Sequence, residues 1–420
     1  MKFLYLSNAR LPSPMAHGLQ IIQNCEAFAD QTTDGLPVEV TLCIPHAPRT
    51  ATSAATSAAT DDLWRFYGVK RNFEVRRLPC INLLHLATPD SLLYRLLFYL
   101  QYGSFSLIAT LASLFTAADV VYSRDPLMVV LVGLTRWMRP GRRLVYEVHQ
   151  SADGIFGRRL QRWALRLSDL AAAITGPLRD KLDGLQTGSR SPTPIIVAHD
   201  GIRRARFEHL PTRDDARQQP GIPPDAFIIG YVGRLKTLGM SKGLDTLIEA
   251  ISQIDQTDTP SVTLIVVGGP EEMIDGYRAQ WADCGLPEDH FRYMGQVSAD
   301  HVPPYLAACD VLAMPLPYTE HFAHYASPIK LFEYMAAGAS GAVMITTDFP
   351  AWADVIQHEQ HALLFPASDT AAMAEAIQRL RDDPALRQRL SQAAAARVFK
   401  DYTWDARAAK ILSALAAASE

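Results

Sequence analysis

The segment SPIKLFEYMAAG, Ser327 to Gly338, predicts a helix that the chain enters through a Ser-Pro pair and that carries one carboxylate, Glu333, in its first turns. The start of a helix leaves backbone N–H groups without partners and carries the positive end of the helix dipole, so it binds anions. A carboxylate one turn into the helix can accept hydrogen bonds from a neutral polyol such as ribose. These two properties side by side indicate a site for a nucleotide sugar.

Around this segment, short apolar runs alternate with amphipathic stretches over the whole chain, as is typical of parallel sheets covered by helices on both faces. In the first half we expect strands at residues 3–6, 38–43, 74–78, 120–123, 144–148, 171–174 and 195–198. In the second half we expect strands at residues 228–232, 263–267, 291–294, 311–313, 343–346 and 362–365. The pattern predicts an α/β fold with two doubly wound, Rossmann-like domains.

The chain length also requires more than one domain, because 420 residues exceed the roughly 250–300 that one core supports. We expect an N-terminal domain at 1–202, a linker at 203–224 that is rich in Arg, Pro and Asp, and a C-terminal domain at 225–404. The last helix, 405–420, follows a lone Trp and should pack back on the first domain.

Composition is that of an ordinary soluble globular protein, with 48% hydrophobic and 20% charged residues. A net charge of −4 gives no overall attraction to nucleic acid. The five cysteines are scattered and include no CxxC pair, so we expect a reduced, intracellular protein without a zinc site or disulfides. The apolar N-terminus is too short for a signal peptide, and the low-complexity stretch 51–60 predicts a surface loop.

One stretch challenges a purely soluble interpretation, because Leu96–Ala118 contains no charged residue and is long enough to cross a bilayer of about 30 Å. Several Ser, Thr, Gln and Gly residues dilute it, and a predicted strand follows at once. Buried or domain-surface helices are therefore favoured over a membrane span, and a pair of helices resting on a membrane stays open.

A second observation on partners concerns the predicted helix that carries Arg158, Arg162 and Arg166 every four residues. Its other side consists of Phe156, Leu160, Trp163 and Leu167. The pattern favours a solvated arginine face over a core stripe. Contact with an anionic acceptor or with lipid is the alternative.

Loops that follow three second-half strands carry the residues expected to bind the ligand, because ligands of open α/β sheets lie beyond the carboxyl ends of the strands. Gly233 and Arg234 follow the strand at 228–232, and Lys242-Gly243 stands shortly after them. An arginine can chelate two phosphate oxygens, and a lysine adds a point charge, so the pair suits a diphosphate. A second strand ends in the tight turn Gly268-Gly269-Pro270, which is weak evidence alone. A third is followed by Gly295-Gln296-Val297, where backbone groups could meet a base edge.

In these motifs the chain resembles the retaining nucleotide-sugar glycosyltransferases of the GT-B fold, specifically the GT4 family. The resemblance covers the whole chain and is strongest in YVGRL with Lys242-Gly243, in LIVVGG, and in the Ser327–Gly338 block. In the first half, Ala16-His17-Gly18 is similar to the family's glycine loop, and YEVH, ending at His149, to its strand-end histidine. The fold implied is GT-B, with two Rossmann-like domains and a cleft between them.

The resemblance implies a role for each matching residue. Arg234 and Lys242 would hold the donor diphosphate, and Glu333 the ribose hydroxyls. Gly18 would let the backbone approach the diphosphate, and His149 would contact the donor sugar. The implied catalytic residues are His149, Arg234, Lys242 and Glu333. The donor-binding candidates are Gly18, Gly233, Gly295, Val297, Tyr325, Ser327, Pro328 and Ile329, with Asp200, Gly201 and Lys330 as further candidates.

Two departures from the family pattern change the expected pocket. Where many members have a first glutamate, this chain has Tyr325, so the backbone of residues 326–329 is expected to read the sugar. The spacing between Arg234 and Lys242 is longer than usual and includes Gly239, which predicts a bulged or mobile loop whose Lys236 could compete for the phosphate.

Other residues are expected to be structural. His17, His199, His321 and His324 have no ligand-like spacing, and Asp200-Gly201 is most simply a turn near the hinge. The sequence contains no Asp-x-Asp, which argues against a metal bridging the diphosphate, and no GxGxxG or GxxxxGK[ST] motif.

These observations favour a cytoplasmic, metal-independent, retaining hexosyltransferase without a cofactor, and action at the inner face of the membrane stays open. Its donor would be a nucleoside-diphosphate sugar, with UDP favoured over GDP, and its acceptor a sugar that is lipid-linked or a small molecule. Two alternatives stay open. One is an enzyme of the same scaffold that makes a different bond, by sugar-nucleotide epimerisation or non-glycosidic coupling. The other is an inactive donor-binding partner subunit.

Overall fold

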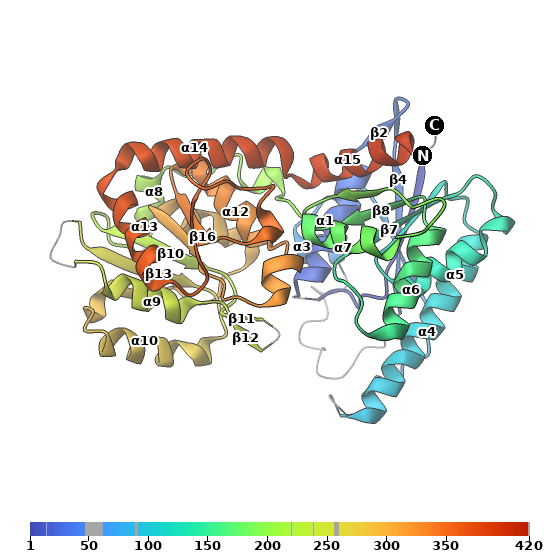
Figure 1. Ribbon diagram of the computed structural model, residues 1–420, viewed down its shortest axis with the longest axis horizontal. Coiled ribbons are helices and arrows are strands. Elements are labelled where there is room, and N and C mark those ends of the chain that lie inside the picture. The colour runs from blue at the N-terminus through green and yellow to red at the C-terminus, as the bar shows by residue number, and fades with distance from the viewer. Residues whose placement is uncertain are drawn as a thin grey trace. The chain divides into compact units, whose positions relative to one another are not determined.

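The computed structural model describes residues 1–13, 15–46, 62–88, 91–219, 221–237, 239–255 and 260–418 (Figure 1). The chain forms two compact units, Met1–His199 with Trp404–Glu420, and Asp200–Thr403. The low-complexity stretch 51–60 lies outside the described residues. Each unit is built on its own parallel sheet and is described by itself.

The first unit contains a seven-stranded sheet of order β5-β4-β1-β6-β7-β8-β9, in which all pairs are parallel. Each strand expected in this half is present within a residue or two of its predicted bounds. The strands are β1 (Lys2–Leu6), β4 (Glu39–Pro45), β5 (Glu74–Leu78), β6 (Val120–Ser123), β7 (Arg143–Val148), β8 (Leu170–Ala173) and β9 (Ile195–Val197). A short hairpin of β2 (Thr32–Thr33) and β3 (Leu36–Pro37) was not expected.

Helices follow most strands of this sheet. They are α1 (Ala16–Ala29), α3 (Leu63–Tyr67), α4 (Leu92–Leu114), α5 (Pro126–Leu134), α6 (Gly154–Leu167) and α7 (Gly176–Leu185). The last helix, α15 (Trp404–Ala417), packs against α1, and Trp404, Ala408 and Ile411 are part of the core of this unit. An apolar stripe on α15 thus stabilises the first unit, although the whole second unit, Asp200–Thr403, precedes it in the chain.

The second unit contains a six-stranded parallel sheet of order β14-β13-β10-β15-β16-β17. The strands are β10 (Phe227–Val232), β13 (Val262–Val267), β14 (Phe291–Tyr293), β15 (Val311–Met314), β16 (Val343–Thr347) and β17 (Leu363–Phe365). The helices are α8 (Arg213–Arg217), α9 (Leu244–Ser252), α10 (Ile274–Asp283), α11 (Val302–Ala308), α12 (Ile329–Ala337), α13 (Thr370–Asp382) and α14 (Pro384–Asp401). One hydrophobic cluster lies on each face of the sheet, because alternate residues of the buried strands point to opposite faces. The fold class predicted from the sequence, two Rossmann-like doubly wound domains, is confirmed.

Residues 203–224, expected to link the domains, lie within the second compact unit. Phe207 and Ile222 are buried in its core. Arg213 and Arg217 both form ion pairs with the buried carboxylate of Asp310, at 2.6 Å each. The arginines that gave this segment the composition of a linker therefore neutralise a buried charge, which needs such partners.

Two expectations for the surface of the first unit differ from the structure. The expected pair of apolar helices is one continuous helix, α4. On α6 the expected core stripe is wrong at Phe156 and Trp163, which are 81% and 51% exposed. The buried side of α6 consists of Gln161, Ala164 and Leu165 instead.

Candidate functional site

Three loops lie together at the carboxyl edge of the second sheet, after β10, β13 and β14. The Gly233 N–H donates to the Val267 carbonyl at 2.7 Å, and the Gly268 N–H donates to the Gly295 carbonyl at 2.9 Å. The Leu235 N–H donates to the Gly269 carbonyl at 2.8 Å. Backbone bonds thus hold the predicted phosphate loop to its two neighbours.

Two glycines in these loops are required by space and by backbone conformation. Gly233 has a φ of +136°, and a Cβ on it would lie 2.6 Å from Cε of Lys330. Gly268 has a φ of +129°, and a Cβ on it would overlap the Gly233 carbonyl. A side chain at Gly268 would push the two loops apart, and one at Gly233 would displace the end of the Lys330 side chain.

The longer spacing between Arg234 and Lys242 is explained by a small antiparallel hairpin of β11 (Lys236–Thr237) and β12 (Met240–Ser241). Its closure brings the Lys242 N–H to the Leu235 carbonyl at 3.2 Å. The expected bulged or mobile loop is thus a hairpin in its described part, and the exposed Lys236 lies on its outgoing strand.

Lys242 and Gly243 form the entry to helix α9. Gly243 has a φ of +81°, and a Cβ there would overlap the carbonyl oxygen of Pro315, so this position is restricted to glycine. Burial and then the guanidinium of Arg234 lower the pKa of Lys242 to about 8. Among the described residues Lys242 forms no ion pair, so its charge lacks a protein counterion.

Lys330, a further candidate, adds a third cation at the same edge. Its Nζ lies 3.9 Å from the centre of the Tyr231 ring and is buried without a hydrogen-bond partner among the described residues. Burial and then Lys242 hold the pKa of Lys330 well below its usual range, and Glu333 acts in the opposite direction. The side chain fills the space that the missing Cβ of Gly233 leaves open.

Glu333 lies one turn into α12, as the sequence predicts, and it already has a partner in the protein. Arg206 donates from Nη1 to Oε1 of Glu333 at 3.1 Å, and both side chains are mostly buried. Arg206 also bonds the Ala299 carbonyl. Sequence reasoning missed Arg206 because it lies in the segment expected to be a linker.

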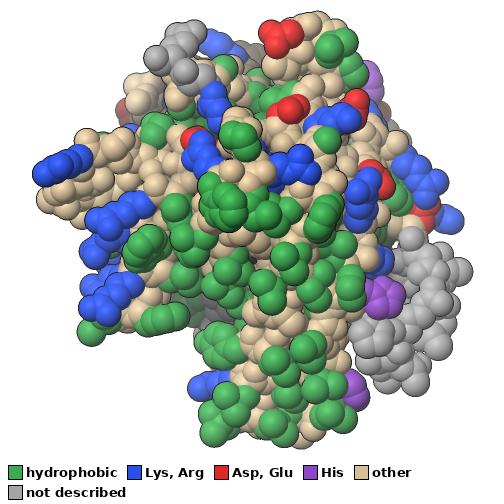
Figure 2. Space-filling model, turned by 90° about the vertical axis from the view of Figure 1, so that its right-hand side faces the viewer, with side chains coloured by type: hydrophobic (Ala, Val, Ile, Leu, Met, Phe, Trp, Pro, Cys, Tyr) green, Lys and Arg blue, Asp and Glu red, His purple; other side chains and the backbone are tan. Residues whose placement is uncertain are grey.

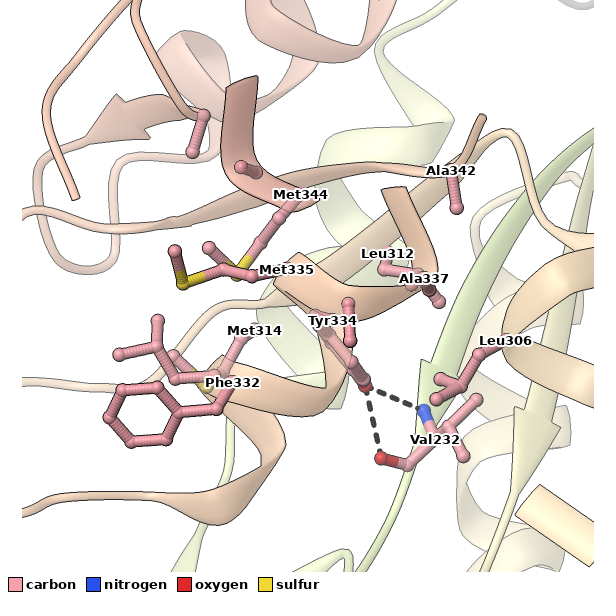
Figure 3. Packing of buried hydrophobic residues seen from close by; sticks show 14 of the residues in the cluster. Val232, Leu306, Leu312, Met314, Phe332, Tyr334, Met335, Ala337, Ala342 and Met344 are labelled. Atoms are coloured by element: carbon pink, nitrogen blue, oxygen red, sulfur yellow. Dashed lines mark hydrogen bonds between the residues drawn. The ribbon is translucent and has the colours of Figure 1, made fainter. Parts of the chain in front are cut away.

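Tyr334, the residue after Glu333, fixes α12 to the sheet. Its hydroxyl accepts from the Val232 N–H at 2.8 Å and donates to the Val232 carbonyl at 3.0 Å, as the dashed lines in Figure 3 show. Both groups are buried, and Val232 is the last residue of β10. The helix that carries Glu333 and Lys330 is therefore tied to the strand that precedes Gly233 and Arg234.

The remaining donor-binding candidates of the second unit each have a hydrogen bond, a backbone conformation or a packing contact that fixes their position. Ser327 Oγ accepts from the Asp200 N–H at 3.0 Å, just before Pro328 and Ile329 begin helix α12. Tyr325 donates from its hydroxyl to Glu320 Oε1 at 3.2 Å. A Cβ on Gly201 would lie 2.6 Å from the Tyr402 carbonyl, so this glycine permits a close chain crossing. Gly295 has a φ of +79°, and Val297 packs against the core.

His321, which the sequence left as structural, is placed close to the cations. Its pKa is lowered first by burial and then by Lys242. It belongs to a short π-helix, His321–Tyr325, directly before the entry to α12. Its position depends on this irregular turn, for which the sequence gave no signal.

In the first unit, Gly18 lies near the start of α1. A Cβ on Gly18 would lie 2.5 Å from the Tyr67 hydroxyl, which in turn donates to the Ser13 carbonyl at 2.9 Å. The space that the family resemblance assigns to a donor is thus partly filled by Tyr67. The glycine is required by internal packing in this structure.

His149 follows β7 and is held by a buried carboxylate. Its Nε2 hydrogen-bonds to Glu147 Oε1, and Glu147 also accepts from Asn24 Nδ2 at 3.1 Å and from the Tyr122 hydroxyl. Arg407, from α15, lies with Nη2 3.4 Å from Glu147 Oε1, and both of these side chains are 2% exposed. The C-terminal helix thus supplies the counterion of the group that orients His149.

The pKa values of both residues are lowered, for different reasons. Burial raises the pKa of Glu147, but Arg407 and then His149 outweigh it, so that the carboxyl remains ionised. Burial and then Arg124 lower the pKa of His149 to about 4, against the opposing effect of Glu147. A neutral His149 that donates from Nε2 to an ionised carboxylate leaves Nδ1 as an acceptor.

Arg124 is a site residue that the sequence analysis did not single out. It follows β6, the strand beside β7, and its Nη1 is buried without a hydrogen-bond partner in the part of the chain described. It also lowers the pKa of His17 after burial has done so. A cation after one strand and a histidine after the next could have been found by aligning the two strand ends.

Comparison with solved structures identifies the fold class. Anabaena HepE, solved in complexes with UDP and with UDP-glucose, shares the architecture; for the UDP complex the TM-score is 0.68 at 18% identity, covering 99% of this chain and 100% of that chain. Sucrose-phosphate synthase from Thermosynechococcus elongatus gives a TM-score of 0.69 at 18% identity over 100% of both chains. The chain therefore has the GT-B fold.

The family follows from sequence comparisons. The family model described as "Glycosyl transferases group 1" matches residues 226–383, which lie in the second unit. The D-inositol 3-phosphate glycosyltransferase of Jonesia denitrificans is 27% identical over 232 residues, which cover 53% of this chain and 51% of that protein. The match thus spans about half the length of this curated relative. Residues 226–383 thus match the group 1 glycosyltransferase domain, and together with the fold these comparisons support a GT4-type glycosyltransferase.

Proposed function

We propose that this protein is a retaining glycosyltransferase that moves a hexosyl group from a UDP-sugar to a sugar-like acceptor without a metal ion. The observation that carries the proposal is the cluster of Arg234, Lys242 and Lys330 at the carboxyl edge of the second sheet. Lys242 and Lys330 have lowered pKa values, in part because these cations repel one another. A bound diphosphate would relieve this repulsion, which is the property of an anion site.

The charge chemistry of the cluster suits the departure of a nucleoside diphosphate. Arg234 can bind two oxygens of the diphosphate, and Lys242 and the start of α9 lie beside it. These groups would stabilise the negative charge that grows as the bond between the sugar carbon and phosphate oxygen breaks. The cations thereby supply the charge that a bridging metal would otherwise provide.

Helix α12 and the residues before it are proposed to contact the ribose and the sugar of the donor. Arg206 holds one oxygen of Glu333 and so leaves Oε2 for a ribose hydroxyl. Ser327, Pro328 and Ile329 would present their backbone to the sugar, in place of the earlier glutamate where this chain has Tyr325. The Gly295–Val297 backbone would contact the base edge. The complexes of HepE with UDP and UDP-glucose support a UDP-sugar over other donors.

In the first unit, His149 and Gly18 are proposed to face the donor sugar, and Arg124 to face the acceptor. Retention would come from front-face substitution, as the family resemblance implies. The acceptor oxygen bonds to the sugar carbon on the side from which the phosphate leaves, and the departing phosphate oxygen takes the acceptor's proton. A neutral His149 can accept a hydrogen bond from a sugar hydroxyl through Nδ1.

Activity measurements on variants test the site. We expect Lys242→Ala and Glu333→Ala to lower turnover of a UDP-hexose by at least about 100-fold, the loss typical of removing one transition-state contact, with unchanged circular dichroism. The matched controls are Lys400→Ala and Glu375→Ala, on the exposed sides of α14 and α13. Near-normal activity of both site variants would refute the assignment.

A thermal-shift panel of UDP, GDP, ADP and their sugars identifies the donor, because a ligand in large excess over its Kd raises the melting temperature. A shift with GDP-sugars alone would contradict the UDP preference. Donor binding without transfer or hydrolysis would favour an inactive partner subunit, and a product without a glycosidic bond would favour the other enzyme class. Retention is tested by the anomeric configuration of the product.

A further inference from the structure

Helix α4 exposes its apolar side and buries its more polar side, which is the reverse of an ordinary surface helix. Apart from Phe105, the side that packs on the unit is small or polar, with Gln101, Ser106, Ala109, Thr110 and Ser113. The outward side is apolar: Leu92 is 74% exposed, Leu96 59%, Tyr99 67% and Leu107 53%. A helix in contact only with water would have the reverse pattern.

The apolar surface continues beyond α4. Helix α4 packs on α5, and α5 packs on α6. The short 3₁₀ turn η3 (Arg136–Met138) after α5 exposes Trp137 to 79%, and α6 exposes Ile155 to 69% together with Phe156 and Trp163. Figure 2 shows hydrophobic side chains gathered over this face of the first unit, including the lower part that α4 forms. We call the outward sides of α4, η3 and α6 the apolar face; a continuous surface of this kind marks an interaction site.

Positive charge accompanies the apolar face. From Pro126 to Ser168 the chain has eight arginines and no lysine, and its only acidic residues are the buried Glu147 and the exposed Asp153. Arg158, Arg159, Arg162 and Arg166 are exposed on α6, and among the described residues none of them pairs with a carboxylate. Two of these guanidinium groups bond only backbone carbonyls, Arg158 at Gly154 and Arg162 at Leu185.

We propose that the apolar face docks the protein on a membrane surface that contains anionic lipids. Tryptophan, phenylalanine and leucine next to arginine on one surface are the composition of segments that lie in the headgroup region. Unpaired arginines supply the complementary charge for lipid phosphates. Helix α4 is long and apolar enough to span a membrane, but one side of it is packed against α5, so it lies on the bilayer. The proposal does not depend on the reaction catalysed.

Vesicle sedimentation tests the proposal with the full-length protein. We expect binding to vesicles of phosphatidylcholine mixed with phosphatidylglycerol, weaker binding at high salt, and little binding to phosphatidylcholine alone. Each arginine at the surface contributes about fivefold, so Arg158→Gln with Arg162→Gln should lower the partition coefficient about 25-fold. Substituting Trp137, Phe156 and Trp163 by serine should abolish binding.

Matched controls separate docking from general surface effects. Leu36→Ser, at an apolar residue 65% exposed on the β2–β3 hairpin, and Arg278→Gln, on α10, should bind vesicles like the unaltered protein. All variants should melt at the same temperature, because their side chains are exposed. Equal binding to both vesicle types, or no binding to either, would overturn the proposal. So would a dimer in solution that the serine substitutions dissociate, because the face would then bind a second copy.

Discussion

Substituting Arg407 by methionine removes the counterion of Glu147 and leaves the shape of the helix surface nearly unchanged. Arg407 lies 3.4 Å from the Glu147 carboxylate, and its Nη1 also donates to Asn24 Oδ1 at 2.7 Å. Because Arg407 comes from α15 and Glu147 from β7, the pair joins the end of the chain to the centre of the first sheet. The variant leaves a buried carboxylate without its main opposite charge.

The expected loss is large. Removing one member of a buried ion pair costs about 3–5 kcal/mol, and a unit of this size loses about 2–4 °C of melting temperature per kcal/mol. The calorimetric transition of the first unit should therefore move down by about 6–20 °C. Protonation of Glu147 would limit the loss, so the difference from the unaltered protein should shrink at acidic pH.

Two further variants test whether the loss of stability comes from the ion pair itself. In Arg407→Met with Glu147→Gln both charges are gone, and at least half of the lost melting temperature should return. Lys410→Met removes a cation from the exposed side of the same helix and should leave the transition in place. A change of about 1 kcal/mol would move the melting temperature by roughly 2 °C. If Arg407→Met melts within about that margin of the unaltered protein, the ion pair does not stabilise the unit.

The remaining predictions concern single residues. Burial and then Arg124 lower the pKa of His149 to about 4 in the folded protein, against 6.5 for the unfolded chain. The stability that follows from this shift is fully present above pH 6.5, and up to about 3 kcal/mol of unfolding free energy is lost as the pH falls to 4. In His149→Gln the unfolding free energy should therefore depend less on pH over that range. Gly243→Ala should weaken UDP binding and lower the melting temperature, whereas Gly276→Ala, where a Cβ meets nothing, should not. Tyr334→Phe unpairs two buried groups of β10 and should cost about 1–3 kcal/mol in denaturant unfolding.

The positions of the main strands of both sheets could be predicted from the sequence because buried parallel strands are short, continuous apolar runs. The loop residues Gly233, Arg234 and Lys242 and the helix start before Glu333 were found in the same way. Their chemistry is local: a glycine, a cation or a helix entry directly follows a strand. Such patterns are visible before any tertiary contact is known.

Contacts over long sequence separations were not visible. Arg206 and Glu333 are 127 positions apart, and Arg407 and Asn24 are 383 apart. Arginines in a charged segment look the same in sequence whether they are solvated or neutralise a buried carboxylate, as Arg213 and Arg217 do at Asp310. Burial decides between the two, and burial depends on the whole fold.

The sequence by itself thus determined two parallel sheets and the cationic loops at one strand edge, because both arise from neighbours along the chain. Only the tertiary structure decided that Arg407, from α15, is the counterion of Glu147 in the first unit. It also decided that α4 and α6 present their apolar sides outward. An amphipathic helix has the same sequence pattern whichever way it is turned, and only its packing partner determines which side meets the solvent.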